Sequence, residues 1–473
     1  MHQTFKRREF LAAIGGLGLA GLGTGLGACS TTSPNKNQVL GSRQIRKLKQ
    51  PGSRPFPAKP AGKDMLDKID HIVVVMLENH SFDNLLGMLG RGDGFSLGPS
   101  GLPLETNPTS SGQEMRLFHM ATPCQLTGYP QNSWNASHIS FDNGTNQGFV
   151  KSSSGPVSMG YWTPIDMPFT SGLARTFPIG DRYFCSVLGP TYPNRCFFMA
   201  GTAYGLTNDT IQSTLPPNGT IFNMLDRFGI SWKNYYSSAP SLGIILPQLA
   251  DSKMRKNAVS IDQFYSDAAE GKLPAFSMVD PNFGTNSEED PQDIQEGDVF
   301  LESVVNAVMH GKRWSKTILV WTYDEHGGYY DHVPPPSAVE PDNIPAKITV
   351  PPDQPGNFKR YGFRVPFGVI SPYARPNYVS HLTHDHTSIL KLIETKWNLP
   401  SLTYRDANAD SLLDSLDLES KPVFLEPPSL PLPANPSLRS RCLLKGPGPV
   451  PTPGPVPTPV SGSSLNQVAK GGK

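Results

Sequence analysis

The amino-acid sequence predicts an α/β fold with a mostly parallel central sheet sandwiched between helices. Short apolar, strand-like runs alternate along the chain with stretches of helical periodicity, a pattern that favours parallel strands covered on both faces. Two of these runs lead directly into acidic and amide side chains. In an open α/β sheet, ligands bind beyond the carboxyl ends of the strands, so these two positions are candidates for a functional site.

Five apolar runs predict the strands of this sheet: residues 71–77, 229–235, 275–279, 317–323 and 367–370.

Two patterns between and after these runs predict helices. Residues 298–309 place four valines and a leucine largely on one face. Residues 386–398 have apolar side chains at helical spacing, with Asp385 as the N-cap. The stretch Pro99–Met167 is rich in Gly, Ser and Asn, and we expect a loop-rich insertion there that folds over the active-site edge of the sheet.

The ends of the chain have the composition of segments outside a folded domain. Lys6-Arg7-Arg8-Glu9-Phe10-Leu11 is a twin-arginine pattern, and Leu26-Gly27-Ala28-Cys29 has the form of a lipobox, where cleavage leaves Cys29 to carry lipid. We expect four segments: a signal peptide at 1–28, a flexible tether at 29–63, a folded domain at 64–431 and a Pro-rich disordered tail at 432–473. A transmembrane anchor and cleavage without lipid are the alternatives.

The charge and the cysteines narrow the class of protein. The net charge of the 473-residue chain is +1, so nothing indicates nucleic acid as a partner. Besides Cys29, the chain has four cysteines, at 124, 185, 196 and 442. Outside the cytoplasm they can form one or two disulfides, and no two have the close spacing of a zinc knuckle. The expected location is the cell envelope, as a membrane-anchored lipoprotein, or the outside of the cell.

Oxygen-bearing side chains at two strand ends predict a divalent metal site. Glu78 and Asn79 follow the first run, and Asp324 and Glu325 follow the run at 317–323. Carboxylate and amide oxygens favour Ca²⁺, Mg²⁺ or Mn²⁺ over Zn²⁺. One acidic pair is weak evidence, because turns are often acidic, but two such pairs are harder to dismiss.

A third segment offers a nucleophile. Leu188–Arg195 contains a Gly-Pro turn that presents Thr191, and residues 196–204 have the pattern of a helix start. A hydroxyl at a helix N-terminus beside a metal can lose its proton and attack phosphorus, and Arg195 can contact a phosphate oxygen. The alternative is a structural turn with a buried threonine.

Two histidine-containing segments offer acid–base or phosphate-binding groups. His384-Asp385-His386 opens the helix at 386–398, and Asp331-His332 lies just beyond the second acidic pair. His386 and His332 are therefore candidates for protonating a leaving alkoxide. Both histidines have a simpler interpretation, as a cap, a core residue or a hydrogen bond within a loop.

These segments, taken in order, resemble the bacterial phosphoesterase family of phospholipases C and related acid phosphatases, in the alkaline-phosphatase-like superfamily. The resemblance runs from Ile69 to about Leu399, and it is greatest to mycobacterial phospholipases C. It rests on His71–Asp83, Gly160-Tyr161, Thr191–Arg195, Tyr323–Pro335, Gly362–Pro366 and Asp385–Ser388.

What the resemblance implies is an alkaline-phosphatase-like fold, a threonine nucleophile and a metal held around it. Carried over by position, the ligands are Glu78, Asn79, Thr191, Asp324 and Glu325. His386 then contacts the phosphate or the leaving group, and Trp134-Asn135-Ala136-Ser137-His138 nominates His138 as a further phosphate contact. The implied reaction is phospholipid head-group hydrolysis through a phospho-threonine intermediate.

The chain departs from the family pattern at four positions, and these keep other functions open. Asn132 and Asp290 stand where relatives usually have histidine, and His80 and Asn84 replace an arginine and a histidine in the first motif. Fewer positive charges leave open an acid phosphatase acting on soluble phosphomonoesters, or a non-catalytic surface lipoprotein. Asp290 is a hypothetical ligand for an additional cation. Sulfate-ester hydrolysis is less well supported, because its characteristic motif is absent at Thr191.

Overall fold

A computed structural model describes residues 47–124, 130–247, 256–349 and 353–434. Contacts divide the chain into Met1–Lys47 and Leu48–Lys473. The first unit, which holds the predicted signal peptide and Cys29, lies outside the described residues except for Lys47, and so does the tail from residue 435. Within the described ranges, no helix is long and apolar enough to span a membrane.

The central element of the fold is an eight-stranded sheet with the strand order β12-β6-β11-β10-β1-β9-β7-β8. Seven of its strands run parallel to one another, and β11 runs against them. The strands are β1 (His71–Leu77), β6 (Ile179–Gly180), β7 (Trp232–Tyr236), β8 (Ala258–Ser260), β9 (Phe276–Asp280), β10 (Thr317–Tyr323), β11 (Phe367–Ile370) and β12 (Val379–Ser380). The predicted mostly parallel sheet is confirmed.

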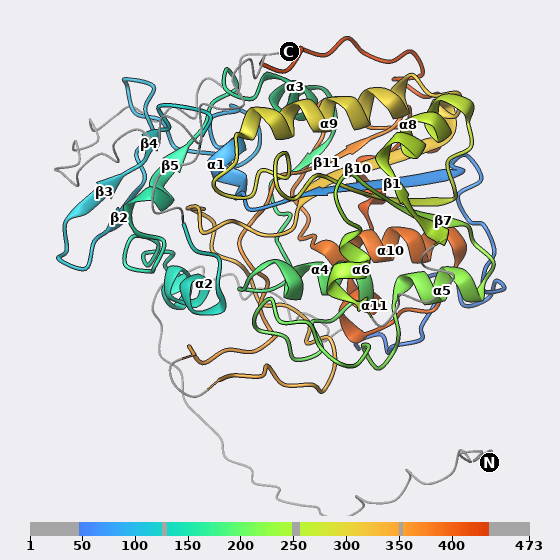
Figure 1. The fold of residues 1–473 in the computed structure, drawn as a ribbon, viewed down its shortest axis with the longest axis horizontal. Coiled ribbons are helices and arrows are strands. Elements are labelled where there is room, and N and C mark those ends of the chain that lie inside the picture. The colour runs from blue at the N-terminus through green and yellow to red at the C-terminus, as the bar shows by residue number, and fades with distance from the viewer. Residues whose placement is uncertain (1–46, 125–129, 248–255, 350–352, 435–473) are drawn as a thin grey trace, which may run out of the picture. The chain divides into compact units, whose positions relative to one another are not determined.

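Helices cover both faces of this sheet (Figure 1). On one face lie α3 (Pro168–Thr176), α8 (Ile261–Glu270) and α9 (Ile294–Met309), with α9 packed on β1 and β10. On the other lie α4 (Thr191–Ala200), α5 (Ile221–Arg227), α6 (Ser241–Ile245), α10 (His386–Trp397) and α11 (Tyr404–Asn408). The helix predicted at 298–309 begins one turn earlier, and Asp385 caps α10 as predicted by accepting from the Thr387 N–H.

The sheet centre is buried on both sides, which explains why its strands are apolar throughout. Ile72, Val73, Val74 and Val75 of β1 have no exposed surface, and they belong to one large core cluster with residues of α9 and α10. Burying a side chain of this size stabilises the fold by roughly 1.5–3 kcal/mol. The branched side chains also fit the pleated backbone of a strand.

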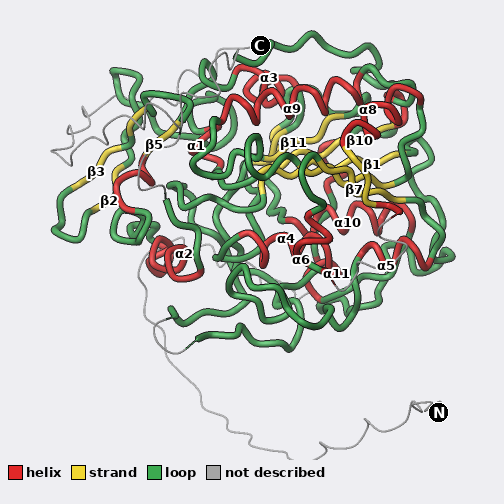
Figure 2. Tube along the Cα trace, in the orientation of Figure 1, coloured by secondary structure: helices red, strands yellow, loops and turns green. Residues whose placement is uncertain are grey.

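The predicted insertion at Pro99–Met167 has more regular structure than its composition indicates. It contains the small sheets β2 (Thr106–Pro108) with β3 (Glu114–Arg116) and β4 (Phe118–His119) with β5 (Gly160–Tyr161), besides α2 (Trp134–Phe141). Figure 2 shows how much of the chain between these elements is loop. A second cluster of buried apolar side chains, which includes Phe149 and Met159, stabilises the insertion.

The second half of the predicted tether is packed against the domain. Residues 47–63 are described, and the side-chain amide of Asn398 binds this segment by accepting from the Phe56 N–H and donating to three of its carbonyl groups. Backbone bonds between Gly52 or Ser53 and Ser401 add to this contact. A polar composition predicts a free segment, but buried hydrogen-bonding groups at the end of α10 hold it instead.

The three cysteines that the structure describes are in two states. Cys124 is disulfide-bonded, whereas Cys185 and Cys196 are buried free thiols. Of the predicted pairings, those that involve Cys185 or Cys196 are therefore excluded.

Candidate active site

The register of β1 and β10 brings the two predicted acidic segments together. The strands pair in parallel from His71↔Thr317 to Leu77↔Tyr323, so Glu78 and Asp324 leave the sheet side by side. The Asn79 N–H donates to Asp324 Oδ1 over 3.3 Å. Glu78, Asn79, Asp324 and Glu325 are all buried, with exposures between 0% and 6%, which is unusual for acidic side chains.

Arg195 lies among these carboxyl groups. Its Nε donates to Asp324 Oδ2 over 2.9 Å, and one terminal nitrogen contacts Glu78 Oε1 at 3.3 Å. The other terminal nitrogen is 3.7 Å from an oxygen of Asp280, at the end of β9. Burial lowers the pKa of the Arg195 guanidinium, but the three carboxylates outweigh burial and raise it above its usual value. Arg195, predicted as a phosphate contact, is thus bound to carboxylates.

The acidic side chains at this edge of the sheet outnumber the single guanidinium among them. Burial, followed by the charge of Asp324, raises the pKa values of Glu78 and Glu325 well above the usual range. Burial also raises the pKa of Asp280. Three buried carboxyl groups around one guanidinium, with Glu325 next to Asp324, favour an additional cation.

The donor set fits a hard divalent cation in its chemistry. It consists of carboxylate, amide and hydroxyl oxygens, without thiol or imidazole. Over the described ranges no three His, Cys, Asp or Glu side chains form a metal-binding group by themselves. A cation here therefore needs the amide oxygen of Asn79 and the hydroxyl of Thr191 in addition to the carboxylates.

Asn132 of the insertion joins two of the predicted ligands. Its side-chain nitrogen donates to Glu325 Oε1 over 2.6 Å and to Asn79 Oδ1 over 3.3 Å. Glu325 Oε2 accepts from the Gly327 N–H over 2.8 Å. The amide that replaces the family histidine thus orients the oxygens of Asn79 and Glu325.

Thr191 opens α4 on the wall of a cavity of about 300 Å³. The helix begins at Thr191 and not near Cys196, because Pro193 falls in its first turn, where the missing N–H costs nothing. The Tyr192 N–H donates to Asp209 Oδ1 over 2.7 Å. The cavity is lined by Glu78, Thr191, Tyr192, Arg195, Asp209, Ser241, Ile244, Ile245, Phe283 and Glu289.

The three predicted histidines do not line this cavity. His386 Nε2 donates to the backbone carbonyl of Asp324 over 2.7 Å, so its ring supports the acidic segment from behind. His138 stacks on Trp134 with ring centroids 4.2 Å apart, and burial lowers its pKa to about 4. His332 forms an ion pair with Asp83, whose carboxylate lies 2.6 Å from Nδ1. Each ring is held by a neighbour, as in the simpler interpretation.

The four departures from the family pattern occupy positions near the site. His80 Nδ1 lies 2.8 Å from Asn84 Oδ1, so the two replaced positions of the first motif contact each other. The His80 ring stacks on Tyr329, and the Tyr329 hydroxyl donates to Asp290 Oδ1 over 3.1 Å. Burial raises the pKa of Asp290 well above its usual value.

Sequence reasoning missed three acidic side chains of the site. Asp280 follows the apolar run at 275–279, so the rule that identified Glu78 and Asp324 also identifies it. Glu289 has a carboxyl group that contacts Glu78. It lies next to Asp290, and the family pattern in this segment concerns only the position of Asp290. Asp209 stands in a polar loop without any signal in the sequence.

Comparison with known proteins identifies the family. A model of the Phosphoesterase family matches residues 69–400. The chain belongs to the Phosphoesterase family. It is 30% identical over 427 residues to phospholipase C B of Mycobacterium tuberculosis, covering 78% of this chain and 81% of the relative. It is 32% identical over 397 residues to non-specific phospholipase C6 of Arabidopsis thaliana, covering 77% and 75%.

Solved structures give a more distant likeness. A protein in the alkaline phosphatase superfamily from Vibrio parahaemolyticus is 11% identical, with a TM-score of 0.33 over 68% of this chain and 77% of that chain. The phosphonate monoester hydrolase of Agrobacterium radiobacter is 10% identical, with a TM-score of 0.34 over 73% and 77%. Family membership and the phospholipase C relatives together make this chain a phospholipase C-like hydrolase that acts on phosphoester bonds.

Proposed function

We propose that this protein is a cation-dependent phospholipase C in which the Thr191 hydroxyl attacks phosphorus. The observation that carries the proposal is the shared cavity of Thr191 and Glu78. Through Arg195, Glu78 belongs to the same buried network as Asp324. A hydroxyl nucleophile and a concentration of carboxylate oxygens therefore lie within one pocket.

The residues that would hold the cation are Glu78, Asn79, Thr191, Asp324 and Glu325. When bound, the cation lowers the pKa of the Thr191 hydroxyl and offsets the charge of the phosphate oxygens. Arg195 donates to Asp324 and contacts Glu78, which holds both side chains in place, and Asn132 fixes the oxygens of Asn79 and Glu325. We propose Ca²⁺, Mg²⁺ or Mn²⁺.

The reaction follows as two displacements at phosphorus. In the first, the Thr191 hydroxyl gives its proton to a carboxylate on the cavity wall, Thr191 Oγ1 forms a bond to phosphorus, and the bond from phosphorus to the leaving alcohol oxygen breaks. The alcohol takes up a proton, and the carboxyl groups of Asp209 and Glu289 on the cavity wall are positioned to pass one. In the second, a water oxygen forms a bond to phosphorus, the bond from phosphorus to Thr191 Oγ1 breaks, Oγ1 takes up a proton from the water, and the phosphomonoester leaves.

The cavity lining supports a lipid substrate. Ile244, Ile245 and Phe283 give one part of the wall an apolar character beside the carboxyl groups. A phosphodiester with an apolar portion next to phosphorus matches this combination better than a small phosphomonoester. The relatives named phospholipases C support the same substrate class.

Thr191→Val tests the nucleophile. We expect turnover of phosphatidylcholine vesicles to fall on the order of a thousandfold, because valine has the shape of threonine without the hydroxyl. Thr191→Ser keeps a hydroxyl and serves as the functional control. Thr176→Val, in α3 outside the cavity lining, controls for the substitution itself.

The same assay tests the substrate and the cation. Phosphatidylcholine vesicles, p-nitrophenyl phosphorylcholine and p-nitrophenyl phosphate are compared with and without EDTA. Hydrolysis of the two phosphodiesters that EDTA abolishes supports the proposal. Normal turnover by Thr191→Val rejects the nucleophile, and a preference for p-nitrophenyl phosphate favours the acid phosphatase alternative.

We also propose export by the twin-arginine route and lipid attachment at Cys29, on the motifs alone. Labelled palmitate supplied to expressing cells should enter the wild-type protein and not Cys29→Ala. Unlabelled wild-type protein in the medium indicates plain cleavage instead.

A further inference from the structure

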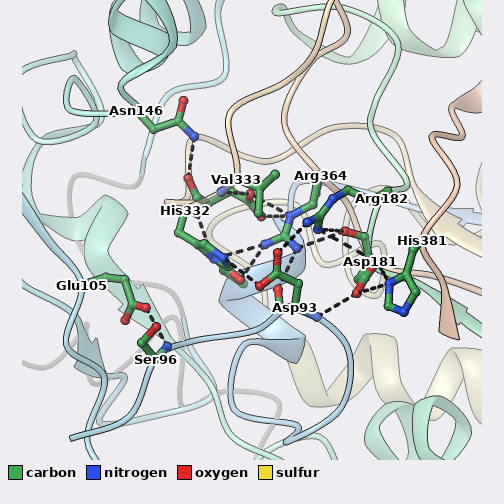
Figure 3. A network of polar contacts seen from close by, with 12 residues as sticks. Asp93, Ser96, Glu105, Asn146, Asp181, Arg182, His332, Val333, Arg364 and His381 are labelled. Carbon is green, nitrogen blue, oxygen red and sulfur yellow. Dashed lines mark hydrogen bonds and ion pairs between the residues drawn. The ribbon is translucent and has the colours of Figure 1, made fainter. Parts of the chain in front are cut away.

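An ionic cluster joins the two loops that carry the predicted ligands, and Figure 3 shows its residues His332 and Arg364. The first loop runs from Glu78 to α1 (Phe82–Leu86), which contains Asp83. The second runs from Asp324 to Asp331 and His332. We call Asp83, Asp331, His332 and Arg364 the loop clamp.

The carboxylate of Asp83 is the centre of the loop clamp. Its Oδ2 accepts from both the backbone N–H and the ring Nδ1–H of His332, over 2.7 and 2.6 Å. Its Oδ1 accepts from Arg364 over 2.9 Å, and Arg364 Nε donates to both oxygens of Asp331 over 2.9 and 3.1 Å. Asp83, Asp331 and Arg364 are fully buried, so these charges attract each other with little screening by water.

His332 has a second acidic partner at the surface. Its Nε2 lies 3.3 Å from an oxygen of Asp93, which also pairs with Arg182 (Figure 3). With one aspartate at each ring nitrogen, the imidazole is held as a cation. His332 therefore supplies a second positive charge to Asp83, because the charge of Arg364 is divided between Asp83 and Asp331.

Between the sheet and the loop clamp the two loops touch along their length. The Ser81 hydroxyl donates to the Tyr330 carbonyl over 2.6 Å. Gly327 has a φ of +64°, and a Cβ there would lie 1.8 Å from the Asn79 carbonyl oxygen. The strand ladder ends at Leu77 and Tyr323, so beyond that point these contacts, the bond between Asn79 and Asp324, the bridge through Asn132 and the loop clamp together set the separation of the loops.

We propose that His332 is a positioning residue that acts through Asp83 to hold the oxygens of Asn79 and Glu325 at cation-binding separation. The inference rests on the proposed function and replaces the predicted role of His332 as a proton donor. The ligand residues lie on the stretch of chain between two fixed ends, one in the sheet and one in the loop clamp. Residues that orient ligands in this way typically change metal affinity or activity by 10–100-fold when removed.

The test replaces the imidazole and leaves the backbone bond in place. In His332→Ala the backbone N–H still donates to Asp83, so the variant removes the side-chain charge alone. The matched control is His381→Ala, because His381 also pairs with a buried aspartate, Asp181, but its side chain is 74% exposed and neither residue is in the ligand loops. His332→Gln, which keeps an N–H donor, is the second variant in case alanine prevents folding.

Two measurements at 25 °C separate positioning from stability. Calorimetric titration with Mn²⁺ gives cation affinity, and hydrolysis of p-nitrophenyl phosphorylcholine gives kcat and KM. For His332→Ala we expect a Kd for Mn²⁺ about tenfold higher and a kcat about tenfold lower, with KM little changed. His332→Gln should lose about threefold, and His381→Ala should stay within twofold.

A purely structural role gives a different result. The inference is rejected if His332→Ala folds and has the Mn²⁺ affinity and kcat of the wild type, with only a lower Tm. The proposed function is kept in that case, because the wild-type protein is active. Equal losses in His332→Ala and His381→Ala also reject it. A wild-type protein that neither binds Mn²⁺ nor hydrolyses the substrate rejects the proposed function, and the inference with it.

Discussion

Removal of the Arg195 charge should destabilise the fold strongly. In Arg195→Gln, Asp324, Glu78 and Asp280 lose a guanidinium that lies 2.9, 3.3 and 3.7 Å away. Asp280 keeps donors from Asn234 and Ser241, and Asp324 keeps backbone N–H donors, but Glu78 loses its basic partner. Leaving buried carboxylates without their cation costs about 3–5 kcal/mol, a large fraction of the roughly 5–15 kcal/mol that stabilises a typical domain.

The sign of the pH dependence follows from the carboxyl groups. Arg195 lowers the pKa values of Glu78 and Asp280, so its removal raises them further above those of the unfolded chain. When the pKa of a carboxyl group is higher in the folded protein than in the unfolded chain, the free energy of unfolding falls as the pH rises above the pKa of the unfolded chain. The deficit of Arg195→Gln should therefore be larger at pH 8 than at pH 5.

Urea unfolding followed by circular dichroism, at both pH values, measures this deficit. Arg182→Gln is the matched control, because Arg182 pairs with Asp93 near the surface, with 33% and 40% of the two side chains exposed. Such an exposed pair contributes about 0–1 kcal/mol. A deficit for Arg195→Gln below about 1 kcal/mol, or one that does not change with pH, would refute the reasoning.

Two further predictions concern the ligand loops. Burial lowers the pKa of His332, but its aspartate partners outweigh burial and raise it to about 10; its stabilising contribution is therefore complete below about pH 6.5 and is lost between about pH 6.5 and 10. The free energy of unfolding should fall over that interval in the wild type and less in His332→Ala, and parallel curves would contradict this. Gly327→Ala should lower both stability and turnover, because the new methyl group meets the Asn79 carbonyl. Gly101→Ala has a similar positive φ but open space, so equal effects in thermal unfolding would show that backbone strain, and not the contact between the loops, is responsible.

The sequence predicted the parts of the fold that depend on local patterns. The apolar runs at 71–77, 317–323 and 367–370 are strands with those bounds, and Asp385 caps α10. Two-residue strands such as β6 and β12 escaped prediction, because a run that short has no measurable period. They form through pairing with each other, which is a property of the tertiary structure.

The same distinction holds for the site. Glu78, Asn79, Asp324 and Glu325 were predicted to converge, and the parallel register of two adjacent strands brings them together. The partners of Arg195 could not be predicted, because its carboxylates come from three separate strand ends. The basic side chain of Arg195 predicts a contact with a phosphate, whereas in the folded protein it binds carboxylates.

The same limit applies to the histidines. The predicted proton-donor role of His332 and His386 depends on their proximity in sequence to acidic or helix-starting residues. Only the tertiary structure shows that the ring nitrogens already bind Asp83 and the Asp324 carbonyl. The chemical role of a histidine depends on those contacts more than on its position in the chain.

The reversed direction of β11 has a consequence for how this enzyme can change. Because β11 is antiparallel to β10, with Thr322 opposite Phe367, the chain leaves the sheet and returns to it at the same edge. The segment from 324 to 366 therefore begins and ends at the edge of the sheet that carries Glu78 and Asp324. Insertions or deletions in its middle, between His332 and Arg364, leave every strand in register and cost little in closure entropy, so this part of the segment is where substrate range can diverge while the chemistry is kept.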